Sequence, residues 1–206
     1  LLPGELRRLV GDWLLLLDGQ TEACDARARR QAFEQHYVVD NSTAVKALLF
    51  GPFVYRKSGG QFTWIRDLWA AGESAVLSLD NLRGISEFAL DCDSTDHTVT
   101  TCENETPFCR LKEEGCAGAL VYTGGFPNGA VMRVLQLLAG HSYRWRHWGD
   151  SDLAGLRIAA MIHRVHPVRL WRCDLPELTR HRPYLRPLTS RQAQSARAFL
   201  HGHPTF

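Results

Sequence analysis

The sequence predicts an α/β protein with a mostly parallel four-stranded sheet flanked by helices, preceded by a region of helices and a β-hairpin. Apolar residues make up 45% and charged residues 22% of the 206 positions, a balance typical of a chain that folds around a core. Segments with strand and helix patterns alternate from residue 98 to residue 172. A polar, turn-rich stretch near residues 90–97 precedes them. We therefore expect two regions, 1–90 and 91–206, the second ending in a basic extension.

The first region has helical patterns followed by a hairpin signal. Residues 5–17 carry apolar side chains at helical spacing, and residues 22–36 read as a charged helix. Asn41 and Ser42 could cap a third helix over 43–50. The β-prone segments 53–57 and 61–65 flank Ser58-Gly59-Gly60 and predict a hairpin. Such a region fits a winged-helix-like module, or equally an α+β cap with no role in DNA binding.

The second region alternates strand and helix. We expect strands at 98–102, 119–123, 143–148 and 168–172, with helices at 108–114, 128–138 and 153–165 between them. This order predicts parallel strands with helices on the faces of the sheet. Ligands of such sheets bind beyond the carboxyl ends of the strands.

Acidic residues and glycines follow these predicted strands. Glu103 follows the first strand, Gly124 and Gly125 follow the second, and Asp150 and Asp152 follow the third. Mg²⁺ prefers oxygen ligands, and two residues spaced two apart on an extended chain share one face. A metal held there would neutralise a phosphodiester and activate water, while the glycines leave room for a phosphate backbone. The sequence therefore predicts a metal site for phosphodiester chemistry.

Each acidic residue also has a plainer interpretation. Asp152 could cap the following helix, Asp150 could belong to a turn, and Glu103 could be a surface carboxylate. Carboxylates clustered without a metal would repel one another, and at least one pKa would rise. A phosphatase of the haloacid dehalogenase type also carries a D-x-D, but after its first strand, so that interpretation is disfavoured.

Three segments together resemble a known family. Residues 102–108, 122–127 and 147–156 are similar to the C-terminal domain of the JetD-like nucleases of Wadjet anti-plasmid systems, themselves similar to the topoisomerase VI A subunit. The resemblance covers about residues 75–175 and implies a Toprim-like (Rossmann-like) fold. It implies a DNA endonuclease dependent on Mg²⁺ or Mn²⁺, with Glu103, Asp150 and Asp152 as catalytic and metal-binding residues. It also implies a homodimer and a role in anti-plasmid or anti-phage defence. An SMC-like, loop-extruding ATPase complex would present the DNA.

The chain departs from that family in two places. Many Toprim proteins carry a third acidic residue where Ala154 stands, which leaves open one metal or two. A nucleophilic tyrosine, as in topoisomerase VI, would have to be Tyr37 or Tyr55, and neither has a matching setting. We therefore expect hydrolysis by water. The alternatives are a catalytically degenerate DNA-binding or scaffold subunit and a topoisomerase-like strand-passage subunit.

Arginine supplies nearly all the positive charge of the C-terminal third, although the net charge is only +2. A GC-rich genome or phosphate binding would each explain this composition. Arg144 and Arg146 alternate with aromatic residues on a predicted central strand, and buried arginines would be costly. We expect them either on a partly exposed strand or pointing to a groove that holds nucleic acid or the acidic site. His147 could polarise a phosphate or could simply pack within the strand.

The cysteines, the apolar runs and the first residue indicate the cellular setting of the protein. None of the six cysteines forms a C-x-x-C pair, so we expect reduced thiols in the cytoplasm and no zinc ribbon. No apolar run approaches the length of a membrane span, so no membrane is expected as a partner. The chain begins without Met, and we expect it to be a fragment of a longer protein.

Overall fold

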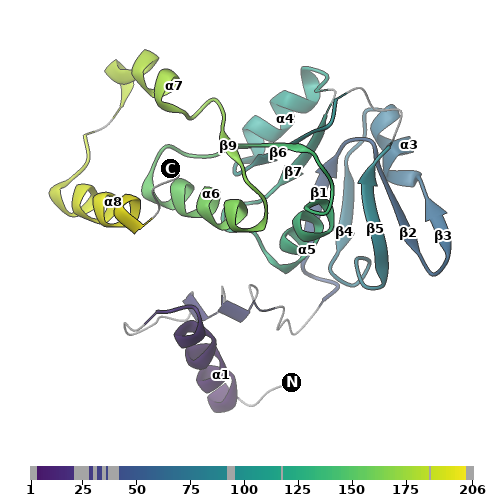
Figure 1. Cartoon of the computed structure of the whole chain (residues 1–206), viewed down its shortest axis with the longest axis horizontal. Helices are drawn as coiled ribbons and strands as arrows, with labels where there is room; N and C mark the ends of the chain where they lie inside the picture. The colour runs from purple at the N-terminus through teal and green to yellow at the C-terminus, as the bar shows by residue number, and fades with distance from the viewer. Residues whose placement is uncertain are drawn as a thin grey trace.

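A six-stranded, mostly parallel sheet organises the computed structural model, which describes residues 4–20, 28–29, 32–33, 36, 42–91, 96–116, 118–185 and 187–202. Its strand order is β4-β1-β7-β6-β8-β9 (Figure 1). In that order the strands are Ala75–Ser78, Lys46–Phe50, Ala119–Tyr122, Thr98–Cys102, Arg144–Trp148 and Arg169–Leu170. The pairs β7–β6, β6–β8 and β8–β9 are parallel, and β1 pairs antiparallel with β4 and β7. The predicted parallel sheet flanked by helices is therefore confirmed, with two antiparallel strands added.

A smaller antiparallel sheet lies beside the first (Figure 1). It contains β3, β2 and β5, which span Gly60–Phe62, Phe53–Lys57 and Ile85–Leu90. The β2–β3 hairpin is confirmed, but its second strand ends at Phe62, and α3 begins at Trp64 and ends at Ala70. The expected strand over 61–65 therefore extends too far, because its last two residues, Trp64 and Ile65, begin the helix α3.

Helices cover the two faces of the main sheet unequally. Alternate residues of the strands pack with α5 (Gly129–Leu138) and α6 (Leu153–Val165) into the larger core, which includes Trp145 of β8. The other strand residues point to the opposite face of the sheet, towards α4 (Glu105–Glu113), which supplies Phe108 and Leu111 to a smaller core. The helices on the first face have 10 and 13 residues, whereas α4 has nine, and α3, which adds Trp69 to the smaller core, has seven.

The other helices lie towards the ends of the chain. They are α1 (Gly4–Leu17), α7 (Leu175–Arg180), a 3-10 helix (Arg182–Tyr184) and α8 (Ser190–Gly202) (Figure 1). In α1, Leu14 and Leu15 are buried against Ala32 and Phe33. Much of the expected apolar face is exposed, namely Leu6, Leu9, Trp13 and Leu17. Within the described ranges, no helix is long and apolar enough to cross a membrane.

One predicted helix is wrong. Residues 43–50 were expected to be helical, but Lys46–Phe50 forms β1 between β4 and β7. Periodicity cannot distinguish a short apolar run in a buried strand from one in a buried helix, and here pairing on both sides decides. The expected helix over 22–36 lies mostly outside the described residues. Of its residues, only 28–29 and 32–33 are seen as helical.

The helices of the second region agree more closely with expectation. The predicted bounds of α6 match the structure, and α5 begins one residue after the expected start, with Asn128 as its cap. The helix α4 begins three residues earlier than expected, because Pro107 is tolerated in a first helical turn. Strands β1 and β4 come from the predicted first region yet complete the sheet of the second, and the boundary at residue 90 stays a prediction.

Leu49→Ala tests the corrected strand. Leu49 is fully buried in β1, and we expect its truncation to lower the free energy of unfolding by about 2–5 kcal/mol. Val76 on the neighbouring strand is 51% exposed, and Val76→Ala should cost less than about 1 kcal/mol. Urea unfolding followed by circular dichroism measures both. Equal losses for the two variants would contradict the placement of β1 in the core.

Candidate functional site

Glu103 and Asp150 meet at the carboxyl end of neighbouring parallel strands. Glu103 directly follows β6, and Asp150 follows β8 after Gly149. The backbone N–H of Glu103 donates to the carbonyl of Trp148 at 3.0 Å. The backbone N–H of Asp150 in turn donates to Glu103 Oε2 at 2.9 Å, across 47 positions of sequence. The parallel pairing therefore brings together two of the residues expected to form the site.

The surroundings of Glu103 disfavour its charged form. The side chain is 8% exposed, and burial is the main cause of a raised Glu103 pKa. The negative charges of Asp150 and Asp152 raise this pKa further, while the hydrogen bond from the Asp150 backbone opposes them. All three carboxylates are thus close enough to interact. A bound cation would relieve the repulsion among them.

Asp150 and Asp152 each make a local contact through one oxygen. Asp150 Oδ1 accepts from Asn104 Nδ2 at 2.7 Å. Asp152 Oδ1 accepts from the backbone of Gly155 at 2.8 Å, so Asp152 is the N-cap of α6. The capping interpretation is confirmed, and a carboxylate that caps through one oxygen still has a second oxygen that could bind a ligand.

The residue types at this edge suit a hard cation, but the arrangement of their side chains does not yet form a metal site. Three carboxylates are the ligand type that Mg²⁺ and Mn²⁺ prefer. Among the residues that the structure describes, however, no group of three or more His, Cys, Asp or Glu side chains is arranged to hold a metal ion. The edge therefore gathers suitable ligands without presenting them as a finished site.

His147 lies beneath this edge, on the buried side of β8. It is 1% exposed, and burial lowers its pKa to about 4, so the imidazole is neutral at pH 7. Its Nδ1 hydrogen-bonds Thr101 Oγ1 at 2.8 Å, whereas its buried Nε2 has no hydrogen-bond partner in the described part of the chain. A Cβ built on Gly149 would lie too close to both His147 Nε2 and Glu103 Oε2, so only glycine fits between them. A neutral, buried ring cannot attract phosphate by charge.

Gly124 and Gly125 shape the loop after β7. Both have left-handed φ angles, 65° and 85°, which favour glycine. The backbone N–H of Gly125 donates to the carbonyl of Glu103 at 3.2 Å and ties this loop to the acidic edge. Nothing lies within 4 Å of a Cβ built on Gly125, so the space beside it is open. A phosphate contact at these glycines stays a prediction.

Arg144 and Arg146 lie on the face of β8 opposite to Trp145 and His147. The side chain of Arg144 is 81% exposed and makes a long ion pair of 3.4 Å with Asp96. Arg146 is half-buried, and its Nε donates to Thr100 Oγ1 at 2.8 Å. The strand face that carries these arginines is thus partly open, so neither cation bears the full cost of burial. Their expected role in DNA binding stays a prediction.

The candidate tyrosines are not seen beside the acids. Tyr37 lies outside the described residues. Tyr55 belongs to the smaller sheet, where it stacks on Phe62 at 5.0 Å and accepts a hydrogen bond from Trp64 Nε1 at 2.9 Å. Its hydroxyl is therefore engaged in local packing.

Cys173 and Asn104 are two residues of the edge that the sequence analysis missed. Cys173 follows β9, is buried, and its thiol donates to the carbonyl of His147 at 3.7 Å. Burial is the main cause of its raised pKa, and the charge of Glu103 contributes. Both residues follow strands, so the same strand-end rule that found Glu103 could have found them.

Gly155→Ala tests how tightly the Asp150–Asp152 turn packs on α6. A Cβ on Gly155 would overlap the carbonyl of Asp150, and backbone cannot move aside cheaply. We expect the free energy of unfolding to fall by at least about 2 kcal/mol. Gly140→Ala, where nothing lies within 4 Å, is the matched control and should change it by less than about 1 kcal/mol. A Gly155→Ala protein as stable as the control would contradict the turn described above.

His147→Gln tests the neutral imidazole. The unfolded chain binds a proton at His147 below pH 6.5, whereas the folded chain binds it only near pH 4. Stability should therefore fall as pH drops through this window, by about 3 kcal/mol from this residue. Urea unfolding in EDTA at pH 7 and near pH 4.5 should show a smaller loss for His147→Gln than for the wild type. Identical pH dependence in the two proteins would show that His147 is not held neutral.

The comparisons with known proteins identify a family. No curated protein matches the chain. The family model described as "Protein of unknown function C-terminus (DUF2399)" matches residues 76–199, which is more than half of the chain and includes every acidic residue discussed above. The chain is therefore a member of the DUF2399 C-terminus family.

Proposed function

We propose that this chain is a DNA endonuclease domain of the Toprim type that uses Mg²⁺ or Mn²⁺ to hydrolyse a phosphodiester bond. One observation carries the proposal. Glu103, Asp150 and Asp152 gather at the carboxyl edge of parallel strands, and both aspartates raise the pKa of the buried Glu103. Acidic groups held against their mutual repulsion are the expected precursor of a divalent-cation site.

Each acidic residue has a distinct role in this proposal. Asp150 and Asp152 are the more exposed pair and would bind the cation through oxygens directed away from their local contacts. Glu103 would act as a further ligand or accept a proton from water, a role that a raised pKa favours near neutral pH. The bound metal would neutralise the phosphodiester and lower the pKa of a coordinated water.

The family supports the wider setting of the proposal. The sequence resembles JetD-like nucleases of Wadjet systems over about the stretch that the DUF2399 model matches, residues 76–199. We accordingly propose a cytoplasmic homodimer that acts in anti-plasmid or anti-phage defence. DNA would reach it through a loop-extruding, SMC-like ATPase complex.

A catalytically degenerate DNA-binding or scaffold subunit is the second candidate. Two observations favour it: Ala154 stands where a third acid is common, and the described residues contain no ready three-ligand cluster. The use of Asp152 as a helix cap points the same way. Metal affinity separates the two candidates, because a scaffold has no need of it.

Nicking of supercoiled plasmid tests the endonuclease. The wild type should nick in Mg²⁺ or Mn²⁺ and should be inactive in EDTA. Glu103→Gln, Asp150→Asn and Asp152→Asn should each lower the rate at least about 100-fold, which corresponds to about 2.7 kcal/mol of transition-state stabilisation. Glu105→Gln is the matched control, because Glu105 is an exposed acid two residues further along, on α4, and its rate should stay near that of the wild type.

The same variants separate loss of function from loss of fold. Because Glu103 is buried and its charged form is disfavoured, Glu103→Gln should unfold at a urea concentration no lower than the wild type. A Glu103→Gln protein that nicks at the wild-type rate would falsify the assigned role. A wild type with no calorimetric Mn²⁺ binding and no nicking would instead support the scaffold.

A further inference from the structure

Arginine and tryptophan side chains cover the part of the main sheet that lies beyond α4. On this face α4 packs against β6 and β7. Over β8 and β9 the same face carries what we call the Arg–Trp row: Arg146, Trp148, Trp171 and Arg172. These four side chains are all half-buried, so they line the surface without being sealed from it.

The members of the Arg–Trp row hold one another in place. The guanidinium of Arg146 lies 3.6 Å from the ring centroid of Trp171. The guanidinium of Arg172 lies 4.5 Å from Trp171 and 4.8 Å from Trp148, and the two indole rings meet edge to face at 5.7 Å. Such cation–π contacts fix flat groups before any ligand arrives, which lowers the ordering cost of binding.

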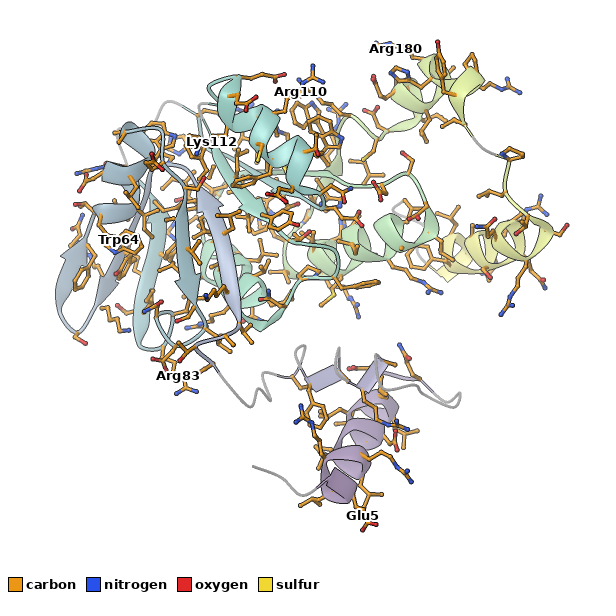
Figure 2. All side chains as sticks on the ribbon, turned by 180° about the vertical axis from the view of Figure 1, so that it is seen from behind. Glu5, Trp64, Arg83, Arg110, Lys112 and Arg180 are labelled. Carbon is orange, nitrogen blue, oxygen red and sulfur yellow. The ribbon has the colours of Figure 1, made fainter. Side chains whose placement is uncertain are left out.

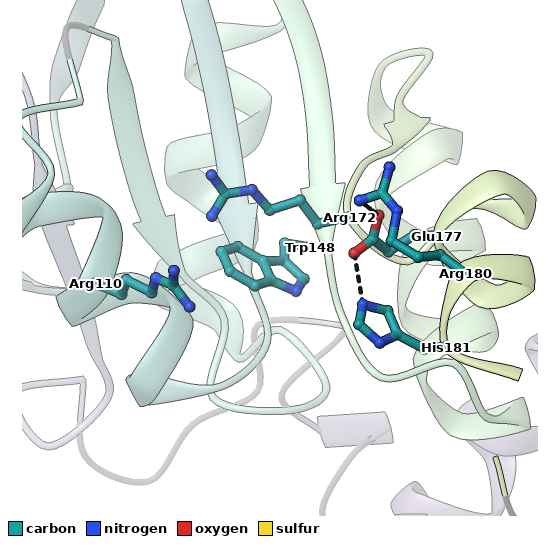
Figure 3. Close-up of a pocket in the computed structure, with 6 residues that line it drawn as sticks. All are labelled: Arg110, Trp148, Arg172, Glu177, Arg180 and His181. Carbon is teal, nitrogen blue, oxygen red and sulfur yellow. Dashed lines mark hydrogen bonds and ion pairs between the residues drawn. The ribbon is translucent and has the colours of Figure 1, made fainter. Parts of the chain in front are cut away.

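Two hollows lie along the row, and cations dominate both. One, of about 440 Å³, lies towards the amino end of β8. It is lined by Asp96, Thr98, Arg144, Trp145, Arg146, Arg169 and Trp171. The other, of about 520 Å³, is lined by Arg110, Trp148, Arg172, Glu177, Arg180 and His181 (Figure 3). Each lining contains three arginines and one acid, and in the second hollow Glu114 also pairs with Arg110 and Arg172. The arginines still outnumber the acids in both hollows, so an anionic ligand suits both.

The second hollow adjoins the acidic edge. Figure 3 shows Trp148 between Arg110 on one side and the group of Glu177, Arg180 and His181 on the other. Trp148 is the last residue of β8 and precedes Asp150 by two positions, and Arg110 comes from the helix that begins just after Glu103. A chain lying along the row would therefore run towards the edge that carries the carboxylates.

Arg172 occupies an unfavourable backbone conformation. Its φ is 59°, in the left-handed region that glycine adopts without strain. A long side chain is present there despite this strain, and its guanidinium contacts both indole rings. Backbone strain of this kind is concentrated at functional sites, and a structural loop would be served better by glycine.

We propose that the Arg–Trp row, with its two hollows, binds a nucleic-acid strand whose bases are unpaired. Phosphates would pair with Arg110, Arg144 and Arg169, while bases stack on Trp148 and the guanidinium planes. The five residues of β8 span about 13 Å along the row. A duplex would leave the indole rings unused, because its bases already stack on one another. The choice of ligand rests on the proposed function, whereas the test below does not require cleavage.

Fluorescence anisotropy with the full chain in EDTA tests this binding. The probes are a labelled oligothymidylate of about 12 nucleotides, an abasic strand of the same length and a duplex of the same length. The oligothymidylate should bind at least about 10-fold more tightly than the other two, because only its bases can stack. Trp148→Leu and Arg172→Gly should each weaken its binding about 10-fold or more.

Matched controls come from elsewhere on the surface. Trp64→Leu and Arg83→Gly remove the same kinds of side chain at places away from Arg110 and Arg180 of the second hollow, as the labels in Figure 2 show. They should leave binding within about 2-fold. Arg172→Gly loses the contacts of the guanidinium but relieves the left-handed strain, so we expect its urea midpoint to stay close to that of the wild type. The midpoint is measured for each variant, so that lost binding is separated from unfolding.

The outcomes separate this proposal from the nuclease. Equal binding of the abasic strand, or tighter binding of the duplex with no effect of Trp148→Leu, would overturn the Arg–Trp site. Effects of the row variants no larger than those of their controls would do the same. Binding as expected in a protein that fails to nick plasmid would support the row and remove only the endonuclease.

Discussion

The hydrogen bond from the Asp150 backbone to Glu103 Oε2 is the contact on which the candidate site depends. It joins the ends of β6 and β8, and it holds a buried carboxylate whose charged form would otherwise be still less favourable. Neighbouring contacts reinforce it: Glu103 N bonds the Trp148 carbonyl, Gly125 N bonds the Glu103 carbonyl, and His147 packs beneath. Backbone N–H groups thus hold this edge together, and the side chains of Asp150 and Asp152 stay exposed.

Much of this arrangement could be predicted from the sequence. The alternation of patterns predicts β6 and α6 to the residue, and the strand-end rule places Glu103 and Asp150 at the same edge of the sheet. The dual nature of Asp152 could be stated but not decided, because a helix cap and a metal ligand use the same residue type. In the structure Asp152 caps α6, and its role as a metal ligand stays a prediction for experiment.

Other parts depended on contacts that no local pattern contains. The apolar run at 46–50 became a strand because β4 and β7 pair with it on either side, and neither partner is near it in sequence. The stacking of Arg146 on Trp171 likewise joins β8 to the residue just after β9, so the arginines of β8 could be noticed in the sequence but their setting could not be explained. The room for the Arg–Trp row on this face likewise depends on the nine-residue helix α4 packing over β6 and β7 and not over β8.

The two-residue length of β9 has a consequence for assembly. An edge strand presents unpaired N–H and C=O groups along its outer side, and a long one invites another strand to extend the sheet. With only Arg169 and Leu170 in the ladder, this border offers too few groups to template a continuous sheet with a second molecule. The rim nearest the arginines therefore resists edge-to-edge aggregation and stays accessible to soluble, charged polymers.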